Sequence, residues 1–209
     1  PDGAAVPCTG GGNCLSWSEN RPMELRFTPL RSRSESGWAE ARRIYEESFP
    51  RCERRADADY DAALADPRFT ADAIRLDGRI VGILYHWRGE GFRYIEYLAF
   101  DPAMRGRNLG TRALEAFCAA DPAPVILEIE PPVDVPTRRR RDFYARLGFV
   151  ENPCDYLHPS YSRPFEPHAL LPLSRPARLT HDEVRRFADF VREHVLRYSE
   201  HDAAPGPRP

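Results

Sequence analysis

The hydrophobic positions of the chain recur with two different periods between residues 23 and 200. Alternation of apolar and polar residues predicts strands, and apolar residues spaced three to four apart predict helices buried on one face. Strands are expected near residues 23–27, 69–76, 79–87, 93–100 and 125–129, from 149 onward, and at 168–173. Helices are expected near residues 38–49, 57–64, 111–119, 137–147 and 180–199. The chain is therefore predicted to be a mixed α/β protein with about seven strands.

Local signals set several of the predicted boundaries. Asp77-Gly78 separates two alternating segments and is a strong signal for a two-residue hairpin turn. Ser34 or Ser36 could cap the first helix. Thr180, with Glu183 three residues later, forms a capping-box pattern and predicts the start of the last helix.

The two ends of the chain lack this periodicity. Residues 1–22 are rich in Gly, Pro, Ser and Asn, and the tail 201–209 is rich in Pro and Gly. Such compositions favour disorder. We expect a disordered extension over residues 1–22, one domain over 23–200 that includes the C-terminal helix, and a loose tail over 201–209.

Composition narrows the class of protein. The chain has 209 residues, 30 basic against 32 acidic, and a net charge of -2, which argues against binding to nucleic acid through bulk electrostatics. The run from Arg138 to Arg141 is interpreted as mainly solvated. Five cysteines without a Cys-x-x-Cys pattern predict neither a zinc site nor a disulfide framework, so a cytoplasmic protein is expected. No apolar run reaches the ~20 residues that span a bilayer, so no membrane segment is expected.

A loop with two glycines and two arginines connects the strand at 93–100 to the following helix: Arg105-Gly106-Arg107-Asn108-Leu109-Gly110. The first amides of a helix have no intrahelical partner, and the helix dipole favours an anion beside them. Glycines allow the backbone to approach a phosphate, and arginines add charged hydrogen bonds. The loop therefore indicates a site for a phosphorylated ligand, although a plain strand-to-helix turn has the same composition.

This loop resembles the acyl-CoA loop of the GNAT superfamily of N-acyltransferases, Arg/Gln-x-x-Gly-x-Gly/Ala. Arg105 occupies the first position, Gly110 the last, and Asn108 replaces the middle glycine. A second segment, Phe143-Tyr144-Ala145-Arg146-Leu147-Gly148-Phe149, is similar to the family's Phe-Tyr-x-x-x-Gly-Phe. The resemblance to bacterial members of the family spans roughly residues 23–174.

The resemblance implies the fold and the ligand. It implies a mixed, mostly antiparallel seven-stranded sheet flanked by helices and splayed at its central strands. It also implies acetyl-CoA as co-substrate, an amine as acceptor, no metal ion, no nucleic-acid or membrane partner, and compatibility with a homodimer. The residues implied to bind acetyl-CoA are Leu98, Ala99, Phe100, Arg105, Gly106, Arg107, Asn108, Leu109, Gly110 and Thr111.

Two residues are candidates for proton transfer. Tyr144 could protonate the departing thiolate, since a tyrosine hydroxyl titrates near pH 10 and a thiol at about 8.5; it could equally be a packed core aromatic. Glu96 could accept the amine proton, directly or through water, or could face solvent. Glu128 and Glu130 on the next predicted strand could line the same acidic cleft or pair with nearby arginines.

The expected function is therefore acetyl-CoA-dependent N-acetyltransfer to a primary amine by direct attack in a ternary complex. Two alternatives remain: a catalytically silent module that senses acyl-CoA, and an interaction domain whose loop binds nothing. The sequence leaves the acceptor open among small-molecule amines, polyamines, antibiotics and protein amino termini.

Overall fold

The computed structural model describes residues 24–154, 157–163 and 167–200. The predicted extension 1–22 and tail 201–209 lie outside these residues. The strands are β1 Leu25–Leu30, β2 Phe69–Leu76, β3 Arg79–Gly89, β4 Phe92–Phe100, β5 Val125–Ile129, β6 Val150–Glu151, β7 Leu157–Pro159, β8 Pro167–Ala169 and β9 Leu171–Arg175. The α-helices are α1 Trp38–Ser48, α2 Asp57–Leu64, α3 Leu109–Ala119, α4 Val135–Arg146 and α5 His181–Phe190.

Seven strands form one sheet in the order β1-β2-β3-β4-β5-β9-β6. Every neighbouring pair is antiparallel except β4 and β5, which run parallel. The short strands β7 and β8 pair separately. The predicted mixed, mostly antiparallel sheet is confirmed.

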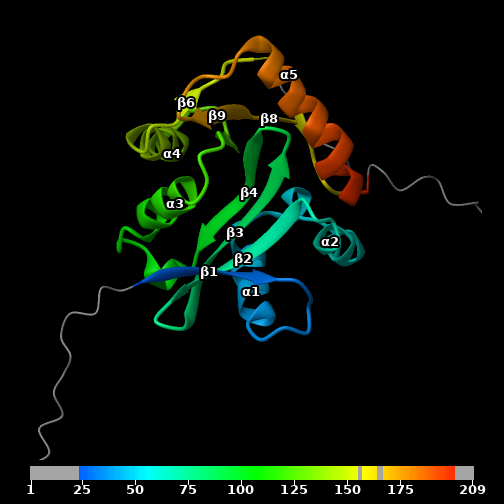
Figure 1. The fold of residues 1–209 in the computed structure, drawn as a ribbon, viewed down its shortest axis with the longest axis vertical. Helices are drawn as coiled ribbons and strands as arrows, with labels where there is room; N and C mark the ends of the chain where they lie inside the picture. The colour runs from blue at the N-terminus through cyan, green and yellow to red at the C-terminus, as the bar shows by residue number, and fades with distance from the viewer. Residues whose placement is uncertain (1–23, 155–156, 164–166, 201–209) are drawn as a thin grey trace, which may run out of the picture.

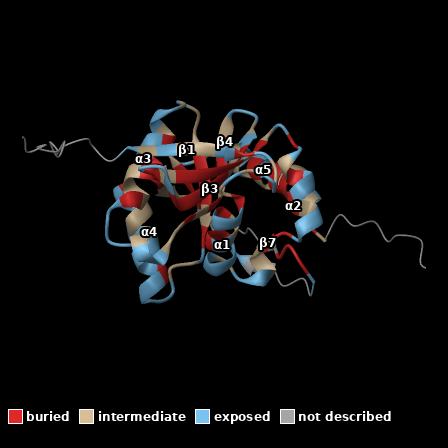
Figure 2. Cartoon of the chain, turned by 90° about the horizontal axis from the view of Figure 1, so that it is seen from below, coloured by how far each residue is buried: buried red, intermediate tan, exposed pale blue. Residues whose placement is uncertain are grey.

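Helices cover both faces of the sheet, and each interface has its own core. In Figure 1, α3 and α4 lie to the left of the strands and α2 and α5 to the right. One core packs α1, α2 and α5 against aromatic residues of the sheet; Tyr45 of α1 and Tyr85 and Trp87 of β3 are at most 1% exposed. The other packs α3 against aliphatic residues such as Leu84 and Leu127. Figure 2 shows the buried strands between helices whose outer faces are exposed.

Several element boundaries follow from local chemistry as expected. Asp77 and Gly78 both have positive φ, 50° and 81°, as a type I′ turn between β2 and β3 requires. The capping box of Thr180 and Glu183 starts α5. Beyond Phe190 the helix continues as one π-helical turn, Val191–Val195, and one 3-10 turn, Leu196–Tyr198.

Three helix starts differ from the prediction. The helix α3 begins at Leu109, two residues earlier than expected, so Leu109 and Gly110 belong to the helix and not to the loop before it. The residue that precedes α1 is Gly37, and no side chain caps this helix, so the expected serine cap was wrong. The helix α4 begins two residues earlier than expected, because Asp134 accepts a hydrogen bond from the Thr137 amide at 2.9 Å and the Thr137 hydroxyl completes the capping box.

Candidate active site

The central strands β4 and β5 separate partway along their length. Residues 93–95 pair with residues 125–127, and the remainder of β4 has no partner on this side. The separation starts at a β-bulge: Tyr85 and His86 of β3 lie opposite Tyr97 and Ile95, which leaves Glu96 as the extra residue. A bulge bends its strand and increases the local twist. The predicted splay is confirmed, and the bulge is its local cause.

A large cavity of about 1410 Å³ occupies this separation. Its walls are the second half of β4, the end of β5, the loop before α4, the inner side of α4, the end of α1 and the segment 158–161. Leu98, Ala99 and Phe100 line it, as expected for residues that would pair with an extended ligand. The polar backbone groups on the unpaired side of β4 are therefore available to such a ligand.

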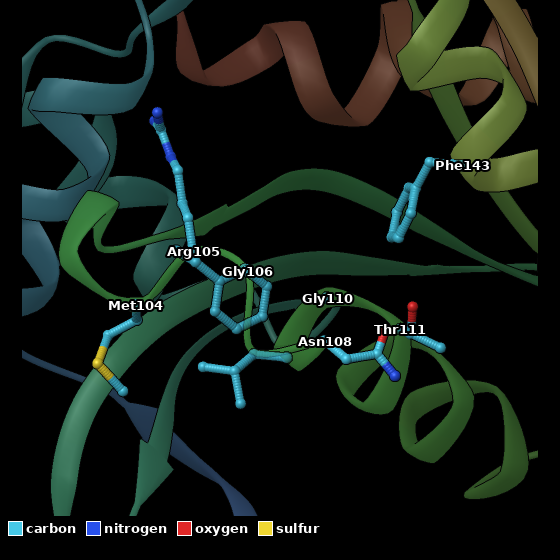
Figure 3. Close-up of a pocket in the computed structure, with 9 residues that line it drawn as sticks. Met104, Arg105, Gly106, Asn108, Gly110, Thr111 and Phe143 are labelled. Carbon is cyan, nitrogen blue, oxygen red and sulfur yellow. The ribbon is translucent and has the colours of Figure 1, made fainter.

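A second pocket of about 410 Å³ adjoins the cavity at the start of α3, and both are lined by Phe100, Arg105, Gly110 and Phe143. Figure 3 shows the loop from Met104 to Gly110 on one side of this pocket and Phe143 of α4 on the other. The remaining predicted loop residues that line it are Gly106, Asn108, Leu109 and Thr111. The structure thus brings the two sequence motifs together across one pocket.

The loop has the features that an anion site requires. Asn108 precedes α3 in the left-handed conformation, with φ 56°, and its side chain does not cap the helix. The first amides of α3 therefore have no capping side chain. Arg105 and Arg107 are exposed, and neither forms an ion pair with a residue that the structure describes. Arg105 lines both pockets and Arg107 lines neither, so Arg105 supplies the positive charge beside these amides.

Gly110 lies close to the opposite wall. A Cβ atom built on this residue would lie 3.2 Å from Cζ of Phe143. This separation is tighter than ordinary van der Waals contact, so a larger side chain would push the Phe143 ring or fill the pocket. The small residue at the end of the motif keeps the pocket open.

Tyr144 lines the large cavity from the last turns of α4. Its ring packs against Phe143 and Phe149, with ring centroids 5.1 and 5.7 Å apart. Within the described part of the chain, no group accepts a hydrogen bond from its hydroxyl. Burial raises the pKa of Tyr144 to about 12. The hydroxyl therefore stays protonated at neutral pH and can donate to a ligand in the cavity.

Glu96 is surrounded by donors. Its carboxylate pairs with the Arg55 guanidinium and accepts hydrogen bonds from Trp87 Nε1 at 2.6 Å and from the Tyr161 hydroxyl. Only 2% of its side chain is exposed. The solvent-facing alternative is therefore wrong, and direct acceptance of a proton from an amine would require one of these three donors to move.

Nothing in the sequence indicates a functional role for Arg55. In the structure its side chain is fully buried and pairs with Glu96. Its guanidinium lies over the rings of Trp87 and Tyr161, 5.5 and 4.7 Å from their centroids, and donates to the Val195 carbonyl at 3.1 Å. Burial alone would lower the pKa of Arg55, but the facing Glu96 carboxylate raises it well above its ordinary value. Arg55 and Glu96 thus form one buried ion pair.

Glu128 lies on β5, one residue beyond the last pair with β4, and lines the same cavity. Its Oε2 accepts a hydrogen bond from the Tyr94 hydroxyl at 2.6 Å. Its Oε1 is buried and has no hydrogen-bond partner among the described residues. Glu130, two residues further along, pairs with Arg140 at 2.6 Å, and both side chains are about half exposed. Glu128 on β5 and Glu130 just after it therefore have different environments.

No group of three or more His, Cys, Asp and Glu side chains in the described segments is arranged to hold a metal ion. No helix among the described residues is both long and apolar enough to cross a membrane.

Comparisons with known proteins agree with this geometry. Residues 38–149, more than half of the chain, match the model of the acetyltransferase (GNAT) family. A search by sequence among curated proteins gives no match. A structure described as an acetyltransferase of the GNAT family, from Bacteroides thetaiotaomicron, is 26% identical, with a TM-score of 0.77 over 82% of this chain and 98% of that chain.

Two more distant structures share the fold. The ribosomal-protein-S18-alanine N-acetyltransferase of Escherichia coli is 15% identical, with a TM-score of 0.51 over 76% of this chain and 97% of that chain. Arabidopsis thaliana Naa50, in complex with the bisubstrate analogue CoA-Ac-MVNAL, is 17% identical, with a TM-score of 0.51 over 72% and 97%. From the family match and the arrangement of loop, helix and separated strands, we conclude that the chain belongs to the GNAT family of acetyltransferases.

Proposed function

We propose that this protein transfers an acetyl group from acetyl-CoA to a primary amine, by direct attack of the amine on the thioester in a ternary complex. The observation that carries the proposal is the continuity of the two pockets. An anion site at the start of α3 opens into a cavity between β4 and β5, and Tyr144 lines that cavity. A ligand with a phosphorylated end and a long extended arm fits this arrangement.

The loop before α3 would hold the pyrophosphate. Arg105 supplies charge, and the amides at the start of α3 supply donors. The unpaired side of β4 at Leu98, Ala99 and Phe100 would hydrogen-bond the pantetheine arm, and one backbone N–H there would face the thioester oxygen. This arrangement brings the reacting carbonyl near the middle of the cavity.

Tyr144 would act as the general acid. Its pKa of about 12 keeps the proton on the hydroxyl at neutral pH, so the hydroxyl can hydrogen-bond to the departing thiolate and pass it a proton as the attacking nitrogen gives one up. The base would be a carboxylate at the separation of β4 and β5. Glu96 is the sequence-based candidate, and Glu128 lines the same cavity from the neighbouring strand.

The proposal is tested by combining CoA binding with product formation. Isothermal titration calorimetry with CoA is expected to show binding, and a panel of amines assayed with acetyl-CoA is expected to release free thiol for at least one class of amine. No binding at millimolar CoA would refute the assignment. Binding without thiol release from any amine would favour the alternative of a catalytically silent acyl-CoA sensor.

A further inference from the structure

Two carboxylates line the cavity, and they differ in how many of their oxygens accept hydrogen bonds. Glu96 accepts from Arg55, Trp87 and Tyr161, so protein groups occupy both of its oxygens. Glu128 accepts only the Tyr94 hydroxyl, on Oε2, and no described group donates to its buried Oε1. The two side chains lie on neighbouring strands at the point where those strands separate.

A buried carboxylate oxygen without a donor is unfavourable, because burial removes its water and nothing replaces it. The described cationic residues that line the cavity are Arg105, Arg139 and Arg140, and none of them pairs with Glu128. Tyr94 already donates a hydrogen bond to Oε2, so Oε1 can accept a hydrogen bond from one further donor. A positively charged nitrogen satisfies both the missing hydrogen bond and the uncompensated charge.

We propose that Glu128 binds the acceptor amine as an aminium ion and takes its proton, and that Tyr94 is a positioning residue that holds this carboxylate. The proposal rests on the proposed function, since it assigns the amine to the acetyl-transfer site. It places Glu96 outside the proton path, as the group that fixes Arg55 and Tyr161 in the cavity wall.

Glu128 and Tyr144 divide the proton transfers of the reaction between them. Glu128 takes one proton from the aminium, which frees the nitrogen lone pair. The nitrogen then forms a bond to the thioester carbon, and the carbon–sulfur bond breaks. Tyr144 gives its proton to the departing thiolate, and the second proton lost from nitrogen restores the Tyr144 hydroxyl. Glu128 finally releases its proton to solvent.

Access to Oε1 requires only a local movement. Less than 1 Å² of this atom is exposed. Glu128 lines the cavity, and a partial rotation of its carboxylate about the last bond, a torsion with broad minima, turns Oε1 toward it. The Tyr94 hydroxyl can bond to either oxygen, so one oxygen stays held while the other faces the amine.

The test compares Glu128→Gln with Glu115→Gln, which makes the same change at an exposed position of α3 outside the cavity. The probes are acetyl-CoA, CoA, n-butylamine and 1,4-diaminobutane. For the best amine of the panel, kcat/KM of Glu128→Gln is expected to fall by about 10² to 10⁴-fold, while the Kd for CoA and the Tm stay unchanged. Tyr94→Phe should raise the KM for the amine without changing the KM for acetyl-CoA. Glu115→Gln should match the wild type.

A direct binding measurement separates this proposal from the proposed function. Wild-type protein saturated with CoA is titrated with each amine, and Glu128→Gln is expected to lose the binding. If wild-type protein binds amine through Glu128 but releases no thiol, acetyl transfer is refuted and the amine site stands. If Glu128→Gln keeps wild-type binding and turnover, the amine site is refuted and acetyl transfer stands. If wild-type protein neither binds nor acetylates any amine, both are refuted.

One further variant distinguishes the two carboxylates. Glu96→Gln, assayed at a temperature at which circular dichroism shows it to be folded, is expected to retain a higher kcat/KM for the amine than Glu128→Gln. A larger loss in folded Glu96→Gln than in Glu128→Gln would overturn the proposal and identify Glu96 as the base.

Discussion

The buried ion pair of Arg55 and Glu96 predicts an unusually large loss of stability for one small substitution. Glu96→Gln keeps the shape of the side chain but only one oxygen, which can accept from Trp87 or from Tyr161 but not from both, because these donors bond to different oxygens of Glu96. It removes the charge that faces a guanidinium with 0% side-chain exposure. Breaking a buried pair in this way typically costs about 3–5 kcal/mol, a large share of the roughly 5–15 kcal/mol that stabilises a domain.

The expected shift in melting temperature follows from the size of the chain. One kcal/mol corresponds to about 2–4 °C for a protein of roughly 150–250 residues. Glu96→Gln should therefore lower Tm by about 6–20 °C. Urea unfolding followed by tryptophan fluorescence gives the free energy directly, because Trp87 lies in the cluster. The expected result is a lower denaturation midpoint with an unchanged m-value.

A double variant and a surface control give the test its specificity. Arg55→Met combined with Glu96→Gln removes both charges, keeps an acceptor for Trp87, and should recover at least about 2 kcal/mol of the loss. The control is Asp189→Asn, which breaks an exposed pair with Arg192 and should cost at most about 1 kcal/mol. If Glu96→Gln costs no more than Asp189→Asn, the reasoning about this buried pair is refuted.

Three further outcomes are expected. Tyr144→Phe should lower kcat by about 10² to 10⁴-fold. The KM for acetyl-CoA, and the shape of the pH–rate profile below the pKa of about 12, should not change. Near-normal turnover in steady-state assays would show that Tyr144 contributes only packing. Arg105→Ala with Gly110→Val should raise the KM for acetyl-CoA strongly with no change in circular dichroism, and an unchanged KM would place the phosphates elsewhere. Thr180→Ala should cost about 0.5–2 kcal/mol in urea unfolding, since it removes the cap of α5; no measurable loss would show that packing alone holds the helix start.

Most of the secondary structure could be predicted because its causes lie close together in the sequence. The turn at Asp77-Gly78 depends on two residues that tolerate positive φ, and the start of α5 depends on two residues three positions apart. The start of α1 was mispredicted because Gly37, rather than a serine, precedes the helix. Arg105 and Gly110 could be proposed for an anion site because the amides and the charge that such a site needs lie within six residues, and both residues line one pocket.

The environment of Glu96 could not be predicted in this way. An alternating strand assigns each residue to one of two faces, and a bulge at Glu96 breaks that alternation without a signal in the sequence. Its charged partner lies 41 residues earlier in the chain and its tyrosine partner 65 residues later. No local pattern distinguishes Arg55 from the rest of the 30 basic residues of the chain.

By itself, therefore, the sequence determined most of the elements and the position of the glycine- and arginine-containing loop before α3, because hydrogen bonds and dihedral preferences among neighbouring residues decide them. It placed Glu96 and Glu128 on successive predicted strands and favoured Glu96 as the proton acceptor. The tertiary structure alone decided that one carboxylate meets a buried arginine and the other keeps an oxygen without a donor among the described residues. The physical reason is that the free energy of a buried charge depends on which distant groups surround it, and only the folded chain brings those groups together.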